Sequence, residues 1–238
     1  VFVTNPTAQH VPIALKAARA GIHLFIEKPI SHTLKNLDNL LAEIKKRKLI
    51  SYTAYNFRFN SLLNTVKEWL GDVNKFGRVI SVHASLGERV ADWHPWEDYR
   101  SSYACRKDLG GGVVLTQSHE IDYLIWLFGP VDSVSAVGGQ LSDLDIEVED
   151  VAKAIFRFKS GMVGSLDLDY LKCPPRRTLE IITTQGRIYW DYFAQFVEFI
   201  PINRKLSGIK VVEPEGFERN TMYLAELKNF LECIKDKK

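Results

Sequence analysis

The first 55 residues alternate short apolar runs with segments of helical periodicity, and this order restricts the possible folds more than any other feature of the chain. Residues 1–4, 23–26 and 49–55 are expected to be strands. Residues 12–20 and a second segment capped by Ser31 or Thr33 are expected to be helices. Neighbouring parallel strands need a connection that crosses one face of the sheet, and this crossover is right-handed. The sequence therefore predicts half of a doubly wound, parallel α/β domain.

The second expected helix has apolar residues at intervals of three and four, namely Leu34, Leu37, Leu41 and Ile44. This spacing predicts one buried face. We interpret the basic run that follows, residues 45–48, as the solvated end of the helix, where cations suit the negative end of the helix dipole. Contact with nucleic acid is disfavoured, because 31 basic and 29 acidic residues give a net charge of only +2 and leave no basic stripe that could follow phosphates.

From residue 57 onward the pattern changes. Residues 61–70 are expected to form a short helix, 77–86 a strand and 112–128 a further helix. Between residues 131 and 212 apolar and polar residues mostly alternate, which predicts half-buried antiparallel strands. A final helix carries Tyr223, Leu227, Phe230 and Ile234 on one face. The expected architecture is α/β plus α+β, with a partial parallel unit at residues 1–56 and an open, mainly antiparallel sheet backed by helices at residues 57–238.

Cysteine usage and hydropathy bear on where such a chain works. Cys105, Cys173 and Cys233 are scattered, without a Cys-x-x-Cys pair or the spacing of metal ligands, so a reducing, cytoplasmic compartment and no metal are expected. No apolar run approaches the ~18 residues that span a bilayer, and no signal peptide is recognised. We therefore expect neither a membrane nor a nucleic acid among the partners.

Glu27-Lys28-Pro29 follows the second expected strand directly. Ligands of doubly wound sheets bind outside the carboxyl ends of the strands, so Lys28 is expected to face the ligand crevice. A surface lysine that pairs with Glu27 is an equally good interpretation of these three residues.

A glycine-rich segment, residues 110–112, leads into a helix that carries His119 and Asp122. Residues three apart share a helix face, so the carboxylate can orient the imidazole, and such a histidine can act as a general base near neutral pH. A histidine that is merely satisfied by its neighbour is the simpler alternative. A metal site is disfavoured, since no third ligand has suitable spacing.

The loop at residues 87–109 is rich in aromatic and charged side chains, including Trp93, Trp96, Tyr103 and Lys107. Flat rings stack on sugar faces, and two tryptophans in a polar loop suit a substrate wall. A loop held to its own domain by these tryptophans is the alternative. Arg176 and Arg177 could bind phosphate or carboxylate or remain solvated.

Four stretches together resemble the Gfo/Idh/MocA oxidoreductases, and they occur in the family's order: residues 4–10 (beginning Thr4-Asn5-Pro6 and ending at His10), residues 20–29 (ending Glu27-Lys28-Pro29), residues 110–122 (Gly110-Gly111-Gly112 through His119 to Asp122) and Trp126-Leu127-Phe128-Gly129. The resemblance covers essentially the whole chain. It implies a Rossmann dinucleotide-binding domain followed by an open-faced sheet domain that binds the substrate. A homodimer or homotetramer through the open sheet is expected separately, because large apolar strand faces rarely stay exposed to water.

The resemblance also implies roles for individual residues. The catalytic residues would be Lys28 and His119. The residues expected to bind NAD or NADP are Thr4, Asn5, Pro6, His10, Glu27, Lys28 and Asn56. The residues expected to bind the substrate are Arg58, Trp93, Trp96, Tyr103, Lys107, Gln117, Asp122, Tyr170 and Arg176.

Two departures from the family pattern bear on function. Many members have an aspartate four or three residues before the histidine, where this chain has Leu115 and Thr116; a neutral side chain cannot stabilise an imidazolium as a carboxylate does. The chain opens with Val1 rather than Met, and we expect the preceding portion, about two βα units with the glycine-rich pyrophosphate turn, to be missing. The expected function is hydride transfer between nicotinamide and a hydroxyl-bearing carbon of a sugar or nucleotide-sugar, in a subgroup similar to surface-sugar biosynthesis dehydrogenases. A catalytically inactive, ligand-sensing protein is the alternative.

Overall fold

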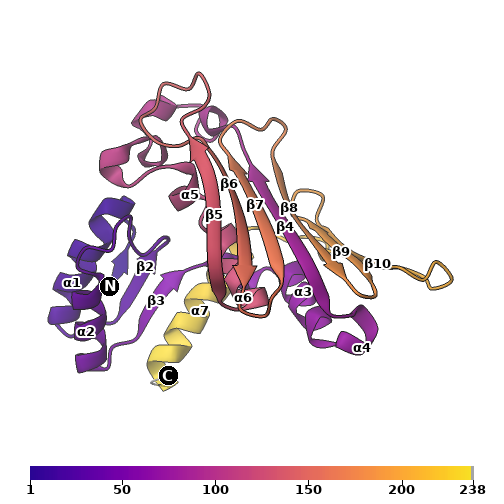
Figure 1. Cartoon of the computed structure of the whole chain (residues 1–238). Coiled ribbons are helices and arrows are strands. Elements are labelled where there is room, and N and C mark those ends of the chain that lie inside the picture. Colours follow the sequence, from indigo (N-terminus) through magenta and orange to yellow (C-terminus); the bar gives the residue numbers. More distant parts are fainter. Residues whose placement is uncertain (237–238) are drawn as a thin grey trace.

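The computed structural model describes residues 1–236, which form two sheets with helices packed against each (Figure 1). Strands β1 (Phe2–Val3), β2 (Leu24–Glu27) and β3 (Ser51–Ala54) make a parallel sheet in the order β1-β2-β3, connected by helices α1 (His10–Arg19) and α2 (Leu37–Arg47). The predicted order of strands and helices in this unit is confirmed.

Both faces of this small sheet are covered. Leu24 and Ile26 of β2 point to the side of α1 and α2, whereas Phe25 between them packs on Phe230 of the last helix, α7 (Asn220–Asp236). Coverage of both faces explains why β2 is a continuous apolar run. In Figure 1, α7 lies beside β3 although the two are far apart in the sequence.

The predicted start of the second helix is wrong, and its predicted buried face is right only for Leu37 and Ile44. Residues 31–36 form turns, and α2 begins only at Leu37, after Asn36 in a left-handed conformation without a side-chain cap. Leu34 and Leu41 are 86% and 55% exposed. The buried face runs through Leu37, Leu40 and Ile44, which pack with residues of α1, so Leu37 and Ile44 of the predicted face are partly buried there and Leu40 is buried in place of Leu41.

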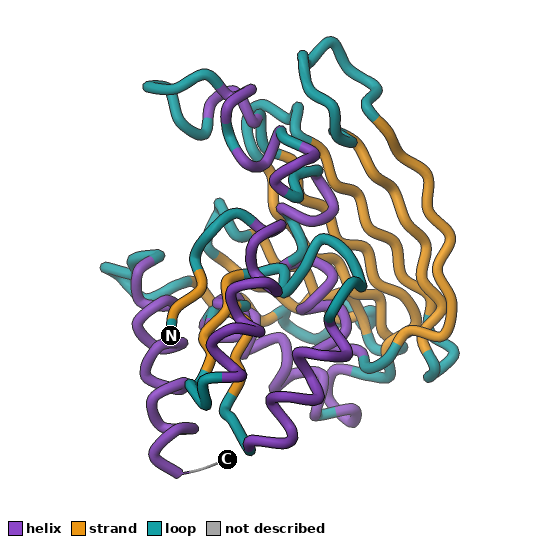
Figure 2. Tube along the Cα trace, turned by 90° about the vertical axis from the view of Figure 1, so that its left-hand side faces the viewer, coloured by secondary structure: helices purple, strands orange, loops and turns teal. Residues whose placement is uncertain are grey.

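The second sheet has eight strands in the order β11-β10-β9-β8-β4-β7-β6-β5, all antiparallel to their neighbours except β4 and β7. The strands are β4 (Val79–Gly87), β5 (Val131–Gly139), β6 (Val151–Phe158), β7 (Val163–Asp169), β8 (Arg176–Thr183), β9 (Gly186–Asp191), β10 (Phe196–Pro201) and β11 (Ile209–Val212). One face is covered by helices and the other is open (Figure 2). The predicted fold class, a partial Rossmann unit plus an open, mainly antiparallel sheet, is confirmed.

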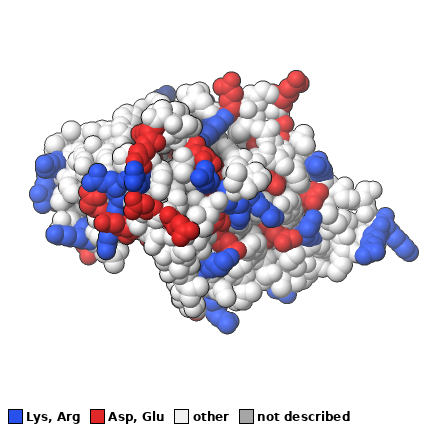
Figure 3. Space-filling model, turned by 90° about the horizontal axis from the view of Figure 1, so that it is seen from above, with Lys and Arg blue, Asp and Glu red and all other residues white. Residues whose placement is uncertain are grey.

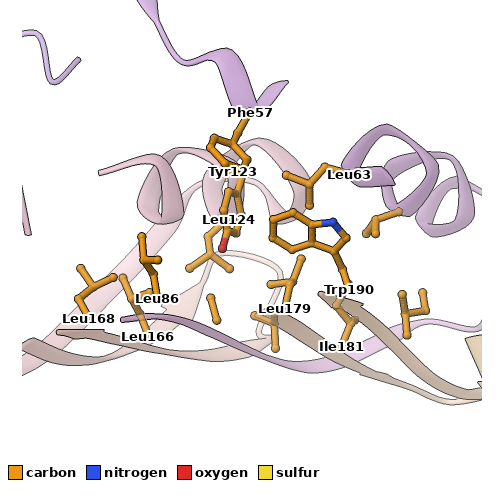
Figure 4. Close-up of a cluster of buried hydrophobic side chains, with 14 of the residues drawn as sticks. Phe57, Leu63, Leu86, Tyr123, Leu124, Leu166, Leu168, Leu179, Ile181 and Trp190 are labelled. Carbon is orange, nitrogen blue, oxygen red and sulfur yellow. The ribbon is translucent and has the colours of Figure 1, made fainter. Parts of the chain in front are cut away.

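Helices α3 (Ser61–Gly71), α4 (Val73–Phe76), α5 (Val113–Thr116) and α6 (His119–Phe128) belong to this second unit. Six 3-10 turns complete the described elements: η1 (Thr7–Gln9), η2 (Asn56–Phe59), η3 (Val90–Asp92), η4 (Tyr99–Ser101), η5 (Tyr103–Cys105) and η6 (Lys107–Leu109). Figure 4 shows Tyr123, Leu124 and Trp190 filling the space between the helices and the sheet. All three are at most 2% exposed, so the largest core of the molecule lies directly behind α6.

Basic and acidic side chains are interspersed on the face seen from above (Figure 3). Among the residues that the structure describes, no helix is long and apolar enough to cross a membrane.

Candidate active site

A cavity of about 680 Å³ lies where the carboxyl end of β2 meets the break between α5 and α6. Its walls come from both units. Glu27, Lys28 and Asn56 line it from the first unit, and Gln117 and His119 line it from the second. The crevice at the carboxyl ends of parallel strands is the place where doubly wound sheets bind their ligands.

Lys28 follows the last residue of β2 and points toward the second unit. Its Nζ donates a hydrogen bond to the carbonyl oxygen of Thr116 at 2.6 Å. Burial lowers the pKa of Lys28 to about 8, the neighbouring Glu27 carboxylate opposes this shift, and the Arg177 guanidinium adds to it. The ammonium is therefore a weakly solvated donor that titrates near physiological pH.

The helix expected at residues 112–128 is interrupted, and the interruption holds Lys28. Helix α5 ends at Thr116 and α6 begins at His119. In a continuous helix the amide of Glu120 would donate to the Thr116 carbonyl; here it donates to the Gln117 carbonyl at 3.4 Å. The Thr116 carbonyl is thereby left for the Lys28 ammonium.

His119 is the first residue of α6 and is 8% exposed at the cavity wall. The rings of Tyr55 and Phe57 lie 5.7 Å and 5.0 Å from its ring centroid. Burial lowers the pKa of His119 well below its usual value, and the positive charges of Lys28 and Arg177 lower it further. His119 is consequently neutral near physiological pH and able to accept a proton.

The predicted pairing of Asp122 with His119 is wrong. Asp122 accepts two hydrogen bonds from the Arg58 guanidinium, at 2.9 Å and 2.7 Å. Asp122 lies on the side of α6 that faces η2, so its carboxylate is used in joining these two elements. Neither Arg58 nor Asp122 is among the residues that line the cavity.

The carboxylate beside His119 is instead Glu120, which the sequence analysis did not single out. Its side chain is fully buried and bonds the Arg177 guanidinium at 2.7 Å, while the guanidinium lies 4.2 Å from the centroid of the Phe57 ring. Burial raises the pKa of Glu120, and the Arg177 charge opposes that shift. Arg177 lines the cavity and Arg176 does not, because adjacent strand residues face opposite sides. The adjacent arginines in the sequence already indicated this difference, because only one of two neighbouring strand residues can point toward the cavity.

The aromatic loop divides into residues at the cavity and residues away from it. Trp93 and Tyr103 line the cavity, and the Trp93 ring packs edge-on against Tyr170, 5.5 Å between centroids. Trp96 is 80% exposed, and neither it nor Lys107 contributes to the wall. Tyr170 is fully buried behind the cavity and donates its hydroxyl to the Ala104 carbonyl at 3.2 Å, so it supports the wall without lining it.

Four residues expected at the cofactor are not part of the cavity wall: Thr4, Asn5, Pro6 and His10. The buried His10 ring joins two loops, with Nδ1 at 2.8 Å from the Pro29 carbonyl oxygen and Nε2 at 2.7 Å from the Asn5 carbonyl oxygen. It braces the segment that carries Lys28. Contact of these four residues with a cofactor stays a prediction.

A second buried carboxylate, on α7, was also missed. Glu226 is 1% exposed, and its pKa is raised to about 8, chiefly by burial and further by the charges of Glu27 and Asp122. Its neighbours on the same helix face, Met222 and Phe230, are buried as well. The helical spacing of these three residues was the available signal.

Several buried polar atoms at the cavity have no hydrogen-bond partner within residues 1–236. They are Asn56 Oδ1, Thr116 Oγ1, Gln117 Oε1 and His119 Nδ1. Buried polar atoms are nearly always paired, so these four atoms of wall residues are candidates for contact with a polar ligand. No group of three His, Cys, Asp or Glu side chains suited to a metal ion occurs in the part of the chain that the structure describes.

Two sequence families match the chain. Residues 64–189 match the GFO/IDH/MocA C-terminal domain, and residues 1–55 match an oxidoreductase family with an NAD-binding Rossmann fold. The chain is 27% identical to the myo-inositol 2-dehydrogenase of Thermotoga maritima over 99% of its own length and 69% of that protein. It is 25% identical to the levoglucosan dehydrogenase of Pseudarthrobacter phenanthrenivorans over 81% of its length, and spans 55% of that relative.

Solved structures agree on the fold. A levoglucosan dehydrogenase in complex with NADH and levoglucosan superposes with a TM-score of 0.88 at 21% identity, over the whole of this chain and 71% of the other. GenD2 from gentamicin A biosynthesis, in complex with NAD, superposes with a TM-score of 0.81 at 23% identity, over 99% of this chain and 68% of the other. Together with the matched families, these findings show that the chain belongs to the Gfo/Idh/MocA family of oxidoreductases.

Proposed function

We propose that the protein is an NAD(P)-dependent dehydrogenase that oxidises a secondary alcohol of a sugar, a cyclitol or a nucleotide-sugar. The observation that carries the proposal is that Lys28 and His119, from different units, line one cavity. The names of two relatives, a myo-inositol dehydrogenase and a levoglucosan dehydrogenase, support a polyhydroxylated substrate. Surface-sugar biosynthesis remains the proposed context.

The residues present fit the nicotinamide end of a dinucleotide. Glu27, Lys28 and Asn56 lie at the carboxyl end of the parallel sheet, and the Asn56 side-chain oxygen has no partner among the described residues. The chain contains no Gly-x-Gly-x-x-Gly turn for the pyrophosphate. A bound nicotinamide would supply the hydride acceptor. We place the boundary between the cofactor-binding and substrate-binding units after Asn56.

Lys28 and His119 would divide the work at the alcohol. The neutral His119 imidazole would accept the hydroxyl proton, a contribution typically worth ~10²–10⁴-fold in rate. The Lys28 ammonium would donate a hydrogen bond to the same oxygen and stabilise the negative charge that develops on it. The hydrogen bond to the Thr116 carbonyl holds the ammonium in place meanwhile.

The test is turnover of a panel of inositols, hexoses and nucleotide-sugars with NAD and with NADP in the full-length protein, followed through the absorbance of the reduced nicotinamide. His119→Ala should reduce kcat by roughly 10²-fold or more, and Lys28→Met should lower kcat more than cofactor affinity. His94→Ala, at the rim of the same cavity, is the matched control and should retain kcat. Wild-type kcat in His119→Ala would refute the assignment.

The same assay separates the enzyme from a ligand-sensing protein without activity. A sensing protein would bind a sugar, measured by calorimetry, while no member of the panel reduces either nicotinamide. The family matched by residues 1–55 is described as an oxidoreductase family, and the two relatives named above are dehydrogenases, which supports the enzyme.

Association through the open sheet is proposed as well. Val137, Ile155 and Val163 on its outer face are 74%, 64% and 44% exposed, and apolar groups gathered on one surface are typical of an interface. The expected assembly is a homodimer or homotetramer. Sedimentation of the full-length protein as a monomer, unchanged by Ile155→Glu, would contradict it.

A further inference from the structure

Five basic side chains line the cavity, and four of them already have an acceptor. Lys28 bonds the Thr116 carbonyl at 2.6 Å. The other three form ion pairs: Arg89 with Asp92 at 2.6 Å, Lys172 with Asp169 at 3.2 Å, and Arg177 with Glu120 at 2.7 Å. The fifth, Arg219, has neither an ion pair nor a side-chain hydrogen bond with any residue between 1 and 236, and its guanidinium lies 5.9 Å from the Tyr223 ring centroid.

Arg219 also occupies a particular place. It lines the main cavity and a smaller one of about 150 Å³, and Tyr192 and Phe193 are the other two residues common to both walls. The guanidinium therefore stands at the boundary between the space that contains His119 and a second, aromatic-walled space. A ligand that extends from one cavity into the other would pass it.

The acidic residues of the walls have other neighbours than Arg219. Glu27 adjoins Lys28, and the charge of Glu88 acts on Arg177. Asp92 pairs with Arg89. In the smaller cavity, Glu213 accepts hydrogen bonds from Asn60 and Ser61. No carboxylate of the described residues lies within ion-pair distance of Arg219.

The positive charge of Arg219 reaches the reacting groups. It contributes to lowering the pKa of both Lys28 and His119. An imidazolium at position 119 is therefore opposed by three cations, and no carboxylate between residues 1 and 236 bonds the ring directly. A negative charge brought by the substrate would offset this excess when the proton is transferred.

We propose that the substrate carries an anionic group, a phosphate or a carboxylate, that binds the Arg219 guanidinium at the boundary of the two cavities, with the carbinol toward His119 and the portion beyond the anion against Tyr192 and Phe193. This inference rests on the proposed function and narrows its substrate to an anionic sugar. Guanidinium donors match both oxyanions in geometry and charge.

The experiment compares glucose, glucuronate, glucose 1-phosphate and UDP-glucose in the full-length protein, together with the Arg219→Gln and Arg219→Lys variants. Binding of each compound is measured by calorimetry, and turnover is measured with NAD and NADP. Arg204→Gln is the matched control, an exposed arginine between β10 and β11 that lines neither cavity.

The expected result is that anionic compounds bind more tightly than glucose, and that Arg219→Gln weakens their binding roughly tenfold or more without affecting glucose. Arg219→Lys should retain part of the affinity. If Arg219→Gln weakens the binding of glucuronate most, the anionic group of the substrate is a carboxylate. If it weakens the binding of glucose 1-phosphate or UDP-glucose most, the group is a phosphate. Equal affinity for neutral and anionic sugars, insensitive to Arg219→Gln, overturns the inference while leaving the dehydrogenase in place. Binding that depends on Arg219 without turnover of any compound supports the anion site and refutes the proposed activity.

Discussion

Removal of the Glu120 carboxylate should destabilise the protein far more than removal of an exposed carboxylate in an equally short ion pair. Glu120 and Arg177 are 2.7 Å apart, with side chains 0% and 10% exposed. In Glu120→Gln the amide still fits, but the guanidinium loses its compensating charge in a site that water scarcely reaches. Breaking a buried pair from one side costs about 3–5 kcal/mol.

The matched control is Asp167→Asn. Asp167 bonds Lys153 at 2.6 Å on the open face of the sheet, with side chains 33% and 58% exposed, and exposed pairs are worth about 0–1 kcal/mol. With a urea dependence near 3 kcal/mol per molar, the urea midpoint should fall by roughly 1–2 M in Glu120→Gln and by a few tenths of a molar in the control.

A double variant separates the charge from simple loss of packing. In Glu120→Gln/Arg177→Met no unpaired charge is left, so much of the lost stability should return. Equal midpoints for Glu120→Gln and Asp167→Asn would refute the view that the buried pair compensates a charge next to His119. A double variant less stable than Glu120→Gln would show that the packing of Arg177 on Phe57, rather than the charge, is what matters.

Two further predictions concern the cavity. The pKa of Lys28 is lowered from 10.5 to about 8, so between pH 8 and pH 10.5 the folded state binds fewer protons than the unfolded state. The stability of the wild type should therefore rise relative to that of Lys28→Met over this pH range. Parallel stability profiles of the two proteins in urea titrations would contradict this prediction. Trp93→Ala should raise KM for the sugar severalfold because Trp93 lines the cavity. Trp96→Ala, at an 80% exposed position, should leave KM unchanged. Equal effects of the two variants on KM in steady-state kinetics would mean that the loop has a purely structural role.

Much of the fold follows from local patterns, and the errors occur where one segment meets another. The alternation of apolar runs predicted the parallel sheet, and the period-two stretches predicted strands such as β6, whose Phe156 and Phe158 face the core. The start of α2 was misplaced because turn residues before Leu37 continue an apparently helical spacing. No local pattern showed that α5 would end at Thr116, whose carbonyl accepts a hydrogen bond from a lysine 88 residues away in the sequence.

The two central residues of the candidate site were predicted from the sequence, but the side chains that pair around them were not. Lys28 and His119 were singled out by motif and both reach the cavity, whereas partner assignments based on helical spacing were wrong. Asp122 is three residues from His119, but three-residue spacing only states which residues can share a face, and Arg58 on η2 competes for the same carboxylate. Glu120 was overlooked because its position next to His119 in the sequence does not indicate a contact between the two side chains. The residue that pairs with the buried Glu120 carboxylate, Arg177, comes from the distant strand β8.

The residues three and four positions before His119, Thr116 and Leu115, are uncharged, and at the break between α5 and α6 the Thr116 carbonyl bonds Lys28. A carboxylate there would attract the Lys28 ammonium and stabilise an imidazolium at His119. In this chain the ammonium is held by a backbone carbonyl, which supplies a dipole and no net charge. Lys28 is thus oriented while its pKa stays low, and His119 stays neutral. Among the described residues no carboxylate bonds the His119 ring, so under the proposed function the negative charge would come from the anionic substrate proposed to bind Arg219.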